Sequence, residues 1–97
     1  MNPALLANDL MYYVYPLQSE KDKHIYIGST NDLNRRLAEH NDGINFSTKA
    51  HVPVKMVYYE AFLNKQDAID REIKLKHHEG VIGLLKRRLK RSLAKTN

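Results

Sequence analysis

The chain has 97 residues, enough for one small domain with a modest core and too few for a second domain. It has no cysteine, which excludes disulfides, thiolate metal sites and a cysteine nucleophile. Sixteen Lys and Arg against eleven Asp and Glu give a net charge of +5, which favours a polyanionic partner; a solubilising surface is the alternative. No apolar run approaches the roughly 20 residues that span a bilayer. No leader is expected either, so the sequence predicts a cytoplasmic protein without a membrane partner.

Two strands are predicted near the N-terminus. They cover residues 10–17 and 24–28, where β-branched and aromatic side chains are frequent, and a polar turn joins them. Pro16 cannot donate to a ladder, so it marks an unpaired position or the end of its strand. The antiparallel pairing is expected to place tyrosines side by side: Tyr26 with Tyr13 or Tyr15.

A helix is predicted from near Asp32 to Gly43, with its N-cap among three polar residues: Ser29, Thr30 and Asn31. At about 100° per residue its leucines mark the buried side, and Arg36 and His40 fall on that side. Burying such groups costs free energy unless they have partners. A conflict between the local pattern and the fold is expected at a functional site.

A polar loop follows this helix. Four of its residues either contact phosphate or are ordinary loop residues: Gly43, Ser47, Thr48 and Lys49. After the loop, residues 54–62 are apolar on both sides and predict a central strand.

The next helix covers residues 65–78 and begins after Asn64, a suitable N-cap. Its apolar arc contains Ile69, Ile73, Ala68 and Leu75. Glu72 and Lys76 fall inside this arc, which is a second conflict of the same kind.

Gly80 separates this helix from a third, which covers residues 81 to about 93. The outer face of the third helix is strongly basic, and packing against the sheet is favoured over attachment to a membrane surface. Its apolar stripe comprises Val81, Ile82, Leu85, Leu89 and Leu93.

These elements follow one another in the order β-β-α-β-α-α. They predict an α+β fold in which a three-stranded, mainly antiparallel sheet is flanked by three helices. We expect a single domain over residues 1–97 with its core at about 10–93, residues 1–9 being a loosely held lead-in.

Five side chains with complementary chemistry are candidates for one site: Tyr15, Tyr26, Arg36, His40 and Glu72. Phosphodiester hydrolysis needs a proton acceptor, a carboxylate for a divalent ion and a cation near the phosphate. Each residue also has an ordinary interpretation. The tyrosines could be sheet residues with satisfied hydroxyls, the Arg and His could flank the core, and Glu72 could pair with Lys76 four residues on.

At these residues the sequence resembles the GIY-YIG nuclease superfamily, especially its small single-domain members, from about Tyr12 to about Leu93. The resemblance rests on YVY at Tyr13–Tyr15, YIG at Tyr26–Gly28, Arg36 ten residues after Tyr26, His40 in RLAEHNDG, and AIDREIKLK around Glu72. The first triplet departs from the family by carrying Tyr13 where glycine is usual.

The resemblance implies a metal-dependent endonuclease, acting on DNA rather than RNA, of a repair, recombination or mobile-element type. Tyr26 would accept the proton of the attacking water, and Tyr15 would orient that water or support the site. Arg36 would stabilise the scissile phosphate, and His40 would hold a tyrosine or the phosphate. Glu72 would be the sole protein ligand of one Mg²⁺ or Mn²⁺, and this ion and Arg36 would lower a tyrosine pKa.

Basic side chains expected to contact nucleic acid are Lys49, Lys76, Arg87, Arg88 and Arg91. The alternative function is a nucleic-acid-binding module that does not cut and binds through its basic C-terminal helix. A third reading is a domain that works with a protein partner or as a homodimer.

Overall fold

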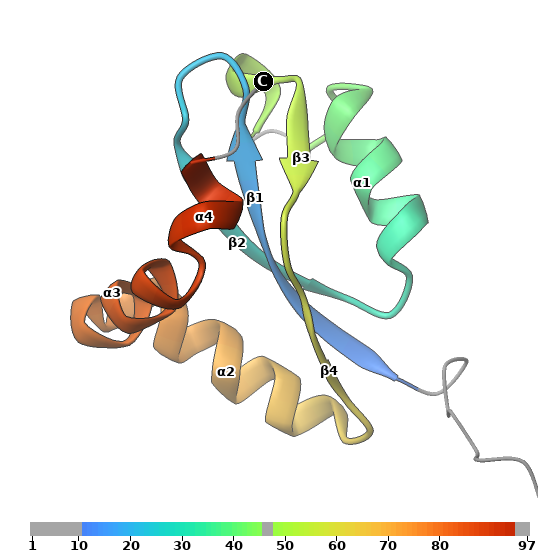
Figure 1. The fold of residues 1–97 in the computed structure, drawn as a ribbon. Coiled ribbons are helices and arrows are strands. Elements are labelled where there is room, and N and C mark those ends of the chain that lie inside the picture. Colours follow the sequence, from blue (N-terminus) through green and yellow to red (C-terminus); the bar gives the residue numbers. More distant parts are fainter. Residues whose placement is uncertain (1–10, 46–47, 95–97) are drawn as a thin grey trace, which may run out of the picture.

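The computed structural model describes residues 11–45 and 48–94, so the predictions for residues 1–9 and Ser47 lie outside the described residues. The strands are β1 (Tyr12–Ser19), β2 (Ile25–Thr30), β3 (Val54–Met56) and β4 (Glu60–Phe62). The helices are α1 (Leu33–Asn41), α2 (Lys65–His77), α3 (Glu79–Arg88) and α4 (Lys90–Ala94), with a 3-10 turn at Lys49–His51. In Figure 1, α1 lies on one side of the sheet and α2, α3 and α4 lie on the other. The predicted α+β fold with an antiparallel sheet is confirmed.

Strand β1 is the centre of the sheet. It pairs with β2 along one edge and with both β3 and β4 along the other, always antiparallel. The predicted central strand over residues 54–62 is therefore wrong, because this segment forms two short strands beside β1. Pairing stops at Leu17–Met56 and resumes at Val14–Glu60, so two residues of β1 face three residues of the outer segment.

Pro16 lies at this interruption. It has a register partner on β2 but none on the side of β3 and β4, where its missing N–H removes no ladder hydrogen bond. The expectation of an unpaired position is thus confirmed for one side. Pro16 does not end the strand, which continues to Ser19.

The two faces of β1 belong to different hydrophobic clusters, as alternation along a strand requires. Val14 packs with buried residues of α2 and α3 and with Leu89 just after α3. Tyr15 and Leu17 pack with Val54 and with the leucines of α1. In the observed register Tyr26 lies opposite Leu17, so the expectation that Tyr13 or Tyr15 would lie directly beside Tyr26 is wrong.

The ends of α1 and α2 are set by side chains and backbone conformation. Asp32 caps α1 by accepting from the backbone N–H of Arg35 at 3.1 Å, so the cap lies just after the three residues predicted for it. Gly43, at φ +75°, follows the end of α1 as predicted. Asn64 caps α2 as predicted, accepting from the N–H of Gln66 at 2.8 Å.

The C-terminal helical region differs from the prediction in its breaks. The first break falls at His78 (φ −125°, ψ 102°), and Gly80 lies inside the first turn of α3. A second break at Leu89 (φ −96°, ψ 18°) divides the predicted third helix into α3 and α4. The predicted apolar stripe of this region does pack into the cluster around Val14.

Helix α2 buries only part of the predicted apolar arc. Ala68 and Leu75 are buried as predicted, whereas Ile73 is 48% exposed. Glu72, which lies inside the arc, faces the sheet, where it contacts Ser29 of β2. No helix within residues 11–45 and 48–94 is long and apolar enough to cross a membrane.

Candidate active site

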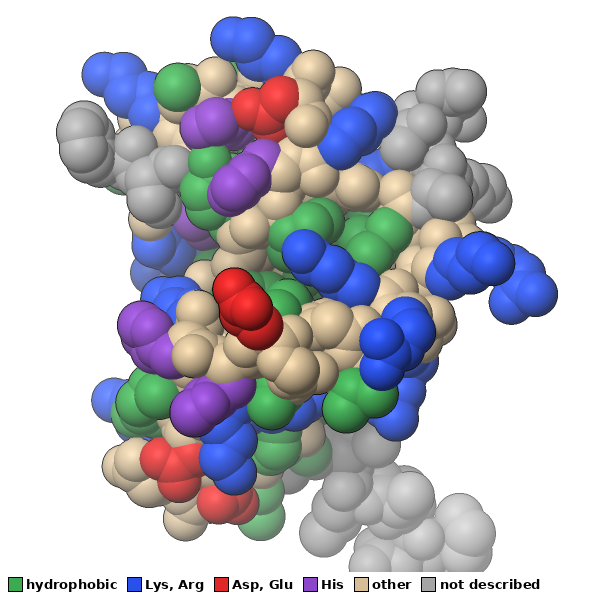
Figure 2. All heavy atoms as spheres, turned by 90° about the vertical axis from the view of Figure 1, so that its left-hand side faces the viewer, with side chains coloured by type: hydrophobic (Ala, Val, Ile, Leu, Met, Phe, Trp, Pro, Cys, Tyr) green, Lys and Arg blue, Asp and Glu red, His purple; other side chains and the backbone are tan. Residues whose placement is uncertain are grey.

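A cavity of about 480 Å³ lies along the outer edge of β2, a strand that among the described strands pairs with β1 alone. All five predicted catalytic side chains line it: Tyr15, Tyr26, Arg36, His40 and Glu72. Figure 2 shows a face of the molecule on which histidine and acidic side chains lie above and below a central apolar area, with Lys and Arg around it. The fold therefore brings together groups that lie up to 57 residues apart in the chain.

Alternation along β2 explains how one strand serves both sides of the cavity. Tyr26 and Gly28 lie opposite Leu17 and Tyr15, on the face covered by α1. Ile27 and Ser29 point to the other face of the sheet, where Ser29 contacts Glu72 of α2. The site is thus assembled around the edge of the sheet.

Gly28 leaves the space that Tyr15 occupies. A Cβ atom at position 28 would lie 2.5 Å from the Tyr15 hydroxyl oxygen and 2.7 Å from its Cζ, closer than real contacts allow. The Tyr15 ring therefore crosses β2 over bare backbone, and its hydroxyl reaches the cavity although the residue is 1% exposed. This accounts physically for the glycine of the YIG triplet.

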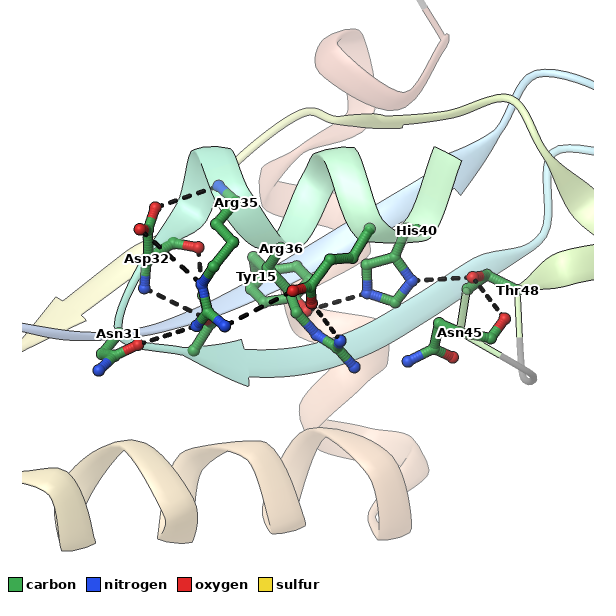
Figure 3. Close-up of polar contacts among 10 residues, drawn as sticks. Tyr15, Asn31, Asp32, Arg35, Arg36, His40, Asn45 and Thr48 are labelled. Carbon is green, nitrogen blue, oxygen red and sulfur yellow. Dashed lines mark hydrogen bonds and ion pairs between the residues drawn. The ribbon is translucent and has the colours of Figure 1, made fainter. Parts of the chain in front are cut away.

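His40 holds Tyr15 from the side of α1. The Tyr15 hydroxyl lies 3.1 Å from His40 Nε2, and His40 Nδ1 lies 2.8 Å from Thr48 Oγ1 (Figure 3). Of the two roles that the resemblance offered His40, the structure shows contact with a tyrosine. Burial lowers the pKa of His40 below 6.5, and the nearby Arg36 cation lowers it further, so the imidazole is neutral.

Arg36 is half-buried at the cavity wall. Its Nη1 donates to Glu39 Oε1 at 2.8 Å, which leaves other guanidinium N–H groups for a phosphate. Arg35 is exposed, and it contacts Asn31, Asp32 and Glu39 at the surface (Figure 3).

Both tyrosine hydroxyls remain protonated near neutral pH. Burial raises the pKa of Tyr15 above its usual value of about 10, although Arg36 opposes the rise. Burial also raises the pKa of Tyr26, and the Asp22 carboxylate adds to this rise. The lowered tyrosine pKa that we expected is therefore not produced by the protein's own charges, since the pull of Arg36 on Tyr15 is smaller than the effect of burial.

Tyr26 stands in a group of rings that sequence reasoning missed. Its ring centroid lies 4.6 Å from that of His24 and 5.3 Å from that of His51. His51 Nδ1 in turn contacts the carboxylate of Asp22. Since His51 arrives through the 3-10 turn of the polar loop, its proximity depends on tertiary structure and has no local sequence signal.

Glu72 is directed into the site and its side chain is only 19% exposed. Ser29 Oγ donates to Oε1 at 2.7 Å, and Lys76 Nζ lies 2.8 Å from Oε2. The ordinary i,i+4 pair with Lys76 is therefore present within the candidate site itself. The Ser29 contact was missed, although alternation with Ile27 places this hydroxyl on the α2 side.

The donor set fits a hard cation held by one carboxylate. Among the described residues that line the cavity, Glu72 is the only acidic one. No group of three or more His, Asp and Glu suited to a metal occurs in the part of the chain that the structure describes. Mg²⁺ is commonly bound by one or two carboxylates with several waters, so a single glutamate beside a hydroxyl suits this ion.

The basic residues predicted to bind nucleic acid divide into two groups. Lys76 lines the cavity. Lys86 also lines it and was not predicted, although it lies one helical turn after Ile82, which lines the cavity too. The others are exposed and do not line it: Lys49, Arg87, Arg88 and Arg91. Arg88 lies close enough to the Tyr58 hydroxyl to lower its pKa, although burial raises that pKa more.

Residues 11–81 match the family model described as the GIY-YIG catalytic domain. The chain belongs to the GIY-YIG family. It is 45% identical over 67 residues to a UPF0213 protein of Clostridium perfringens, a match that covers 68% of this chain and 71% of the relative. A UPF0213 protein of Streptococcus pneumoniae is 43% identical over 65 residues, 66% of this chain and 65% of the relative. The UPF0213 protein YsiG of Lactococcus lactis is 45% identical over 67 residues, 68% of this chain and 64% of the relative.

Membership of the GIY-YIG family places the chain in a nuclease superfamily, whose members act on nucleic acid. The match spans slightly less than two thirds of the streptococcal and lactococcal relatives. Their names state no substrate, metal or pathway.

Proposed function

We propose that this protein is a metal-dependent endonuclease that hydrolyses phosphodiester bonds in nucleic acid, with DNA as the preferred substrate. The observation that carries the proposal is the convergence of Tyr15, Tyr26, Arg36 and Glu72 on one cavity of a GIY-YIG domain. Ordinary sheet tyrosines and an ordinary helix-surface ion pair would have no reason to share a cavity with a half-buried arginine.

The charges of the cavity suit a phosphate backbone. Arg36, Lys76 and Lys86 line it against a single carboxylate, so the site carries a net positive charge. Arg36 can donate two parallel hydrogen bonds to phosphate oxygens and stabilise charge as it builds during attack. The two lysines act as point charges farther along the strand.

The tyrosines act on the attacking water. Tyr15, held by His40, orients the water. Tyr26, once it has lost its own proton to solvent, accepts a proton from the water as the new O–P bond forms and the scissile P–O bond breaks, and the leaving oxygen takes up a proton from solvent. Because burial keeps both hydroxyls protonated in the free protein, Tyr26 can act as an acceptor only when positive charge near the water favours loss of its own proton. A divalent ion held by Glu72 would supply that charge and polarise the phosphate.

The proposal is tested by incubating the full chain with plasmid, single-stranded, branched and RNA substrates in Mg²⁺ or Mn²⁺. Glu72→Gln and Arg36→Gln should each reduce cleavage by at least about 100-fold. Glu79→Gln is a matched control, because this exposed acid lies in α3 outside the cavity, and it should cleave like the wild type.

Cleavage that survives both cavity substitutions would refute the site. Salt-sensitive binding without cleavage of any substrate would refute the enzyme and favour the non-cleaving module, whose affinity would come from exposed residues such as Arg87 and Arg91.

A further inference from the structure

A buried row of hydrogen bonds runs from the cavity into the polar loop. The Tyr15 hydroxyl meets His40 Nε2 at 3.1 Å, His40 Nδ1 meets Thr48 Oγ1 at 2.8 Å, and Thr48 Oγ1 donates to the carbonyl oxygen of Asn45 at 3.5 Å. Figure 3 shows His40 between Tyr15 and Thr48, with Asn45 next to Thr48. Tyr15, His40 and Thr48 are 1%, 5% and 0% exposed, so water does not compete for these bonds.

The direction of these bonds follows from the loop end of the row. A backbone carbonyl can only accept, so the Thr48 hydroxyl proton is directed to Asn45 O, and Thr48 Oγ1 accepts from His40 Nδ1–H.

The cavity end then follows. A neutral imidazole that carries its single proton on Nδ1 has an unprotonated Nε2. Nε2 therefore accepts from the Tyr15 hydroxyl, whose proton points to His40. Each donor in the row thus has one acceptor.

We propose that Thr48 is a positioning residue that fixes His40 in the Nδ1–H tautomer and thereby turns the Tyr15 proton away from the cavity. The Tyr15 oxygen then presents only lone pairs to the site. A water in the cavity donates to this oxygen and directs its own lone pair elsewhere, toward a phosphate bound at Arg36. This consequence for the rate rests on the proposed function, whereas the tautomer itself does not.

Thr48 is too deeply buried for the phosphate contact considered from the sequence. Thr48 lies in the wall of the cavity but is 0% exposed, and its hydroxyl is engaged by His40 and by Asn45 O, so its effect on the site passes through His40. Without the Thr48 hydroxyl, His40 could carry its proton on Nε2 and donate to the Tyr15 oxygen. The Tyr15 proton would then turn into the cavity and block acceptance from water.

The tautomer can be read in the free protein by two-bond ¹⁵N–¹H NMR of the histidine rings. We expect His40 to be protonated at Nδ1 in the wild type and in Thr48→Ser, which keeps the hydroxyl. Thr48→Val has nearly the same shape and should lose this preference. Ser19→Ala is the matched control, since it removes another fully buried hydroxyl that donates to His51 O at 2.6 Å, and it should leave His40 unchanged.

A wild-type His40 protonated at Nε2 would overturn the proposal, as would an unchanged tautomer in Thr48→Val. If Thr48→Val does not fold, the wild-type spectrum alone decides between the two tautomers. On whichever substrate the wild type cleaves, Thr48→Val should lower kcat about 10- to 100-fold with little change in KM, and Thr48→Ser should restore it. A wild type that cleaves nothing would refute the proposed function and leave the NMR result to judge the tautomer.

Discussion

Substituting Gly28 by alanine tests the packing that places Tyr15 in the site. The new Cβ would lie 2.5 Å from the Tyr15 hydroxyl oxygen, whereas ordinary contact begins at 3.4 Å, so the ring must move by about 0.9 Å. Tyr15 is 1% exposed and has little room to move. Overpacking of this kind costs about 1–3 kcal/mol, and the lower backbone entropy of alanine offsets about 0.5–1 kcal/mol.

We therefore expect Gly28→Ala to lose about 1–2 kcal/mol of unfolding free energy, which lowers Tm by about 5–15 °C in a domain of this size. The displaced ring should also lose its bond to His40 and with it most of the cleavage activity. Urea and thermal unfolding measure the first effect, and cleavage by the still-folded protein at low temperature measures the second.

Gly83→Ala is the matched control. Its Cβ would meet no atom within 4 Å, and position 83 lies inside α3, so the variant should gain up to about 1 kcal/mol. If Gly28→Ala were as stable as Gly83→Ala and cleaved like the wild type, the argument for Gly28 would be refuted.

Three further predictions concern charge. Because the pKa of His40 is lowered from 6.5, the contribution of His40 to stability is complete above about pH 6.5 and is lost as the pH falls through the lowered value. His40→Gln should therefore flatten the decline of Tm between about pH 7 and 5. An unchanged decline would contradict this. Lys76→Met removes the ion pair with Glu72 Oε2, which is worth about 0.2–1 kcal/mol. The affinity for Mn²⁺, measured by calorimetry, should therefore rise up to about fivefold. A lower affinity would contradict a metal site at Glu72. Arg71 holds the half-buried Glu60 by two bonds of 2.8 and 2.9 Å, so Arg71→Met should cost about 1–3 kcal/mol in urea unfolding yet leave activity per folded molecule unchanged. A loss of activity greater than the unfolded fraction would place Arg71 in the site.

Much of the fold followed from local patterns. Alternation along a strand requires Val14 to face away from Tyr15 and Leu17, and the observed clusters have this separation. The helical repeat placed Arg36 and His40 on the covered side of α1, where the structure has them. These features depend on residues only a few positions apart, so a single sequence contains them.

Other features depend on contacts that no local pattern contains. The hairpin register, which sets Tyr26 opposite Leu17, is fixed by the geometry of the turn. The split of the outer strand into β3 and β4 depends on its pairing with β1. Thr48 becomes a partner of His40 only after the polar loop has folded against α1, and its polar neighbours in sequence indicated a surface residue instead.

The position of the site at a strand edge also has a consequence for how a long polymer would reach it. Among the described residues no further strand pairs with the outer side of β2, and the side chains that line the cavity come from both faces of the sheet at that edge. Under the proposed function, a polynucleotide would therefore lie sideways against this edge at any point along its length. Neither of its ends would have to be threaded through the protein, which is the access that scission at an interior linkage requires.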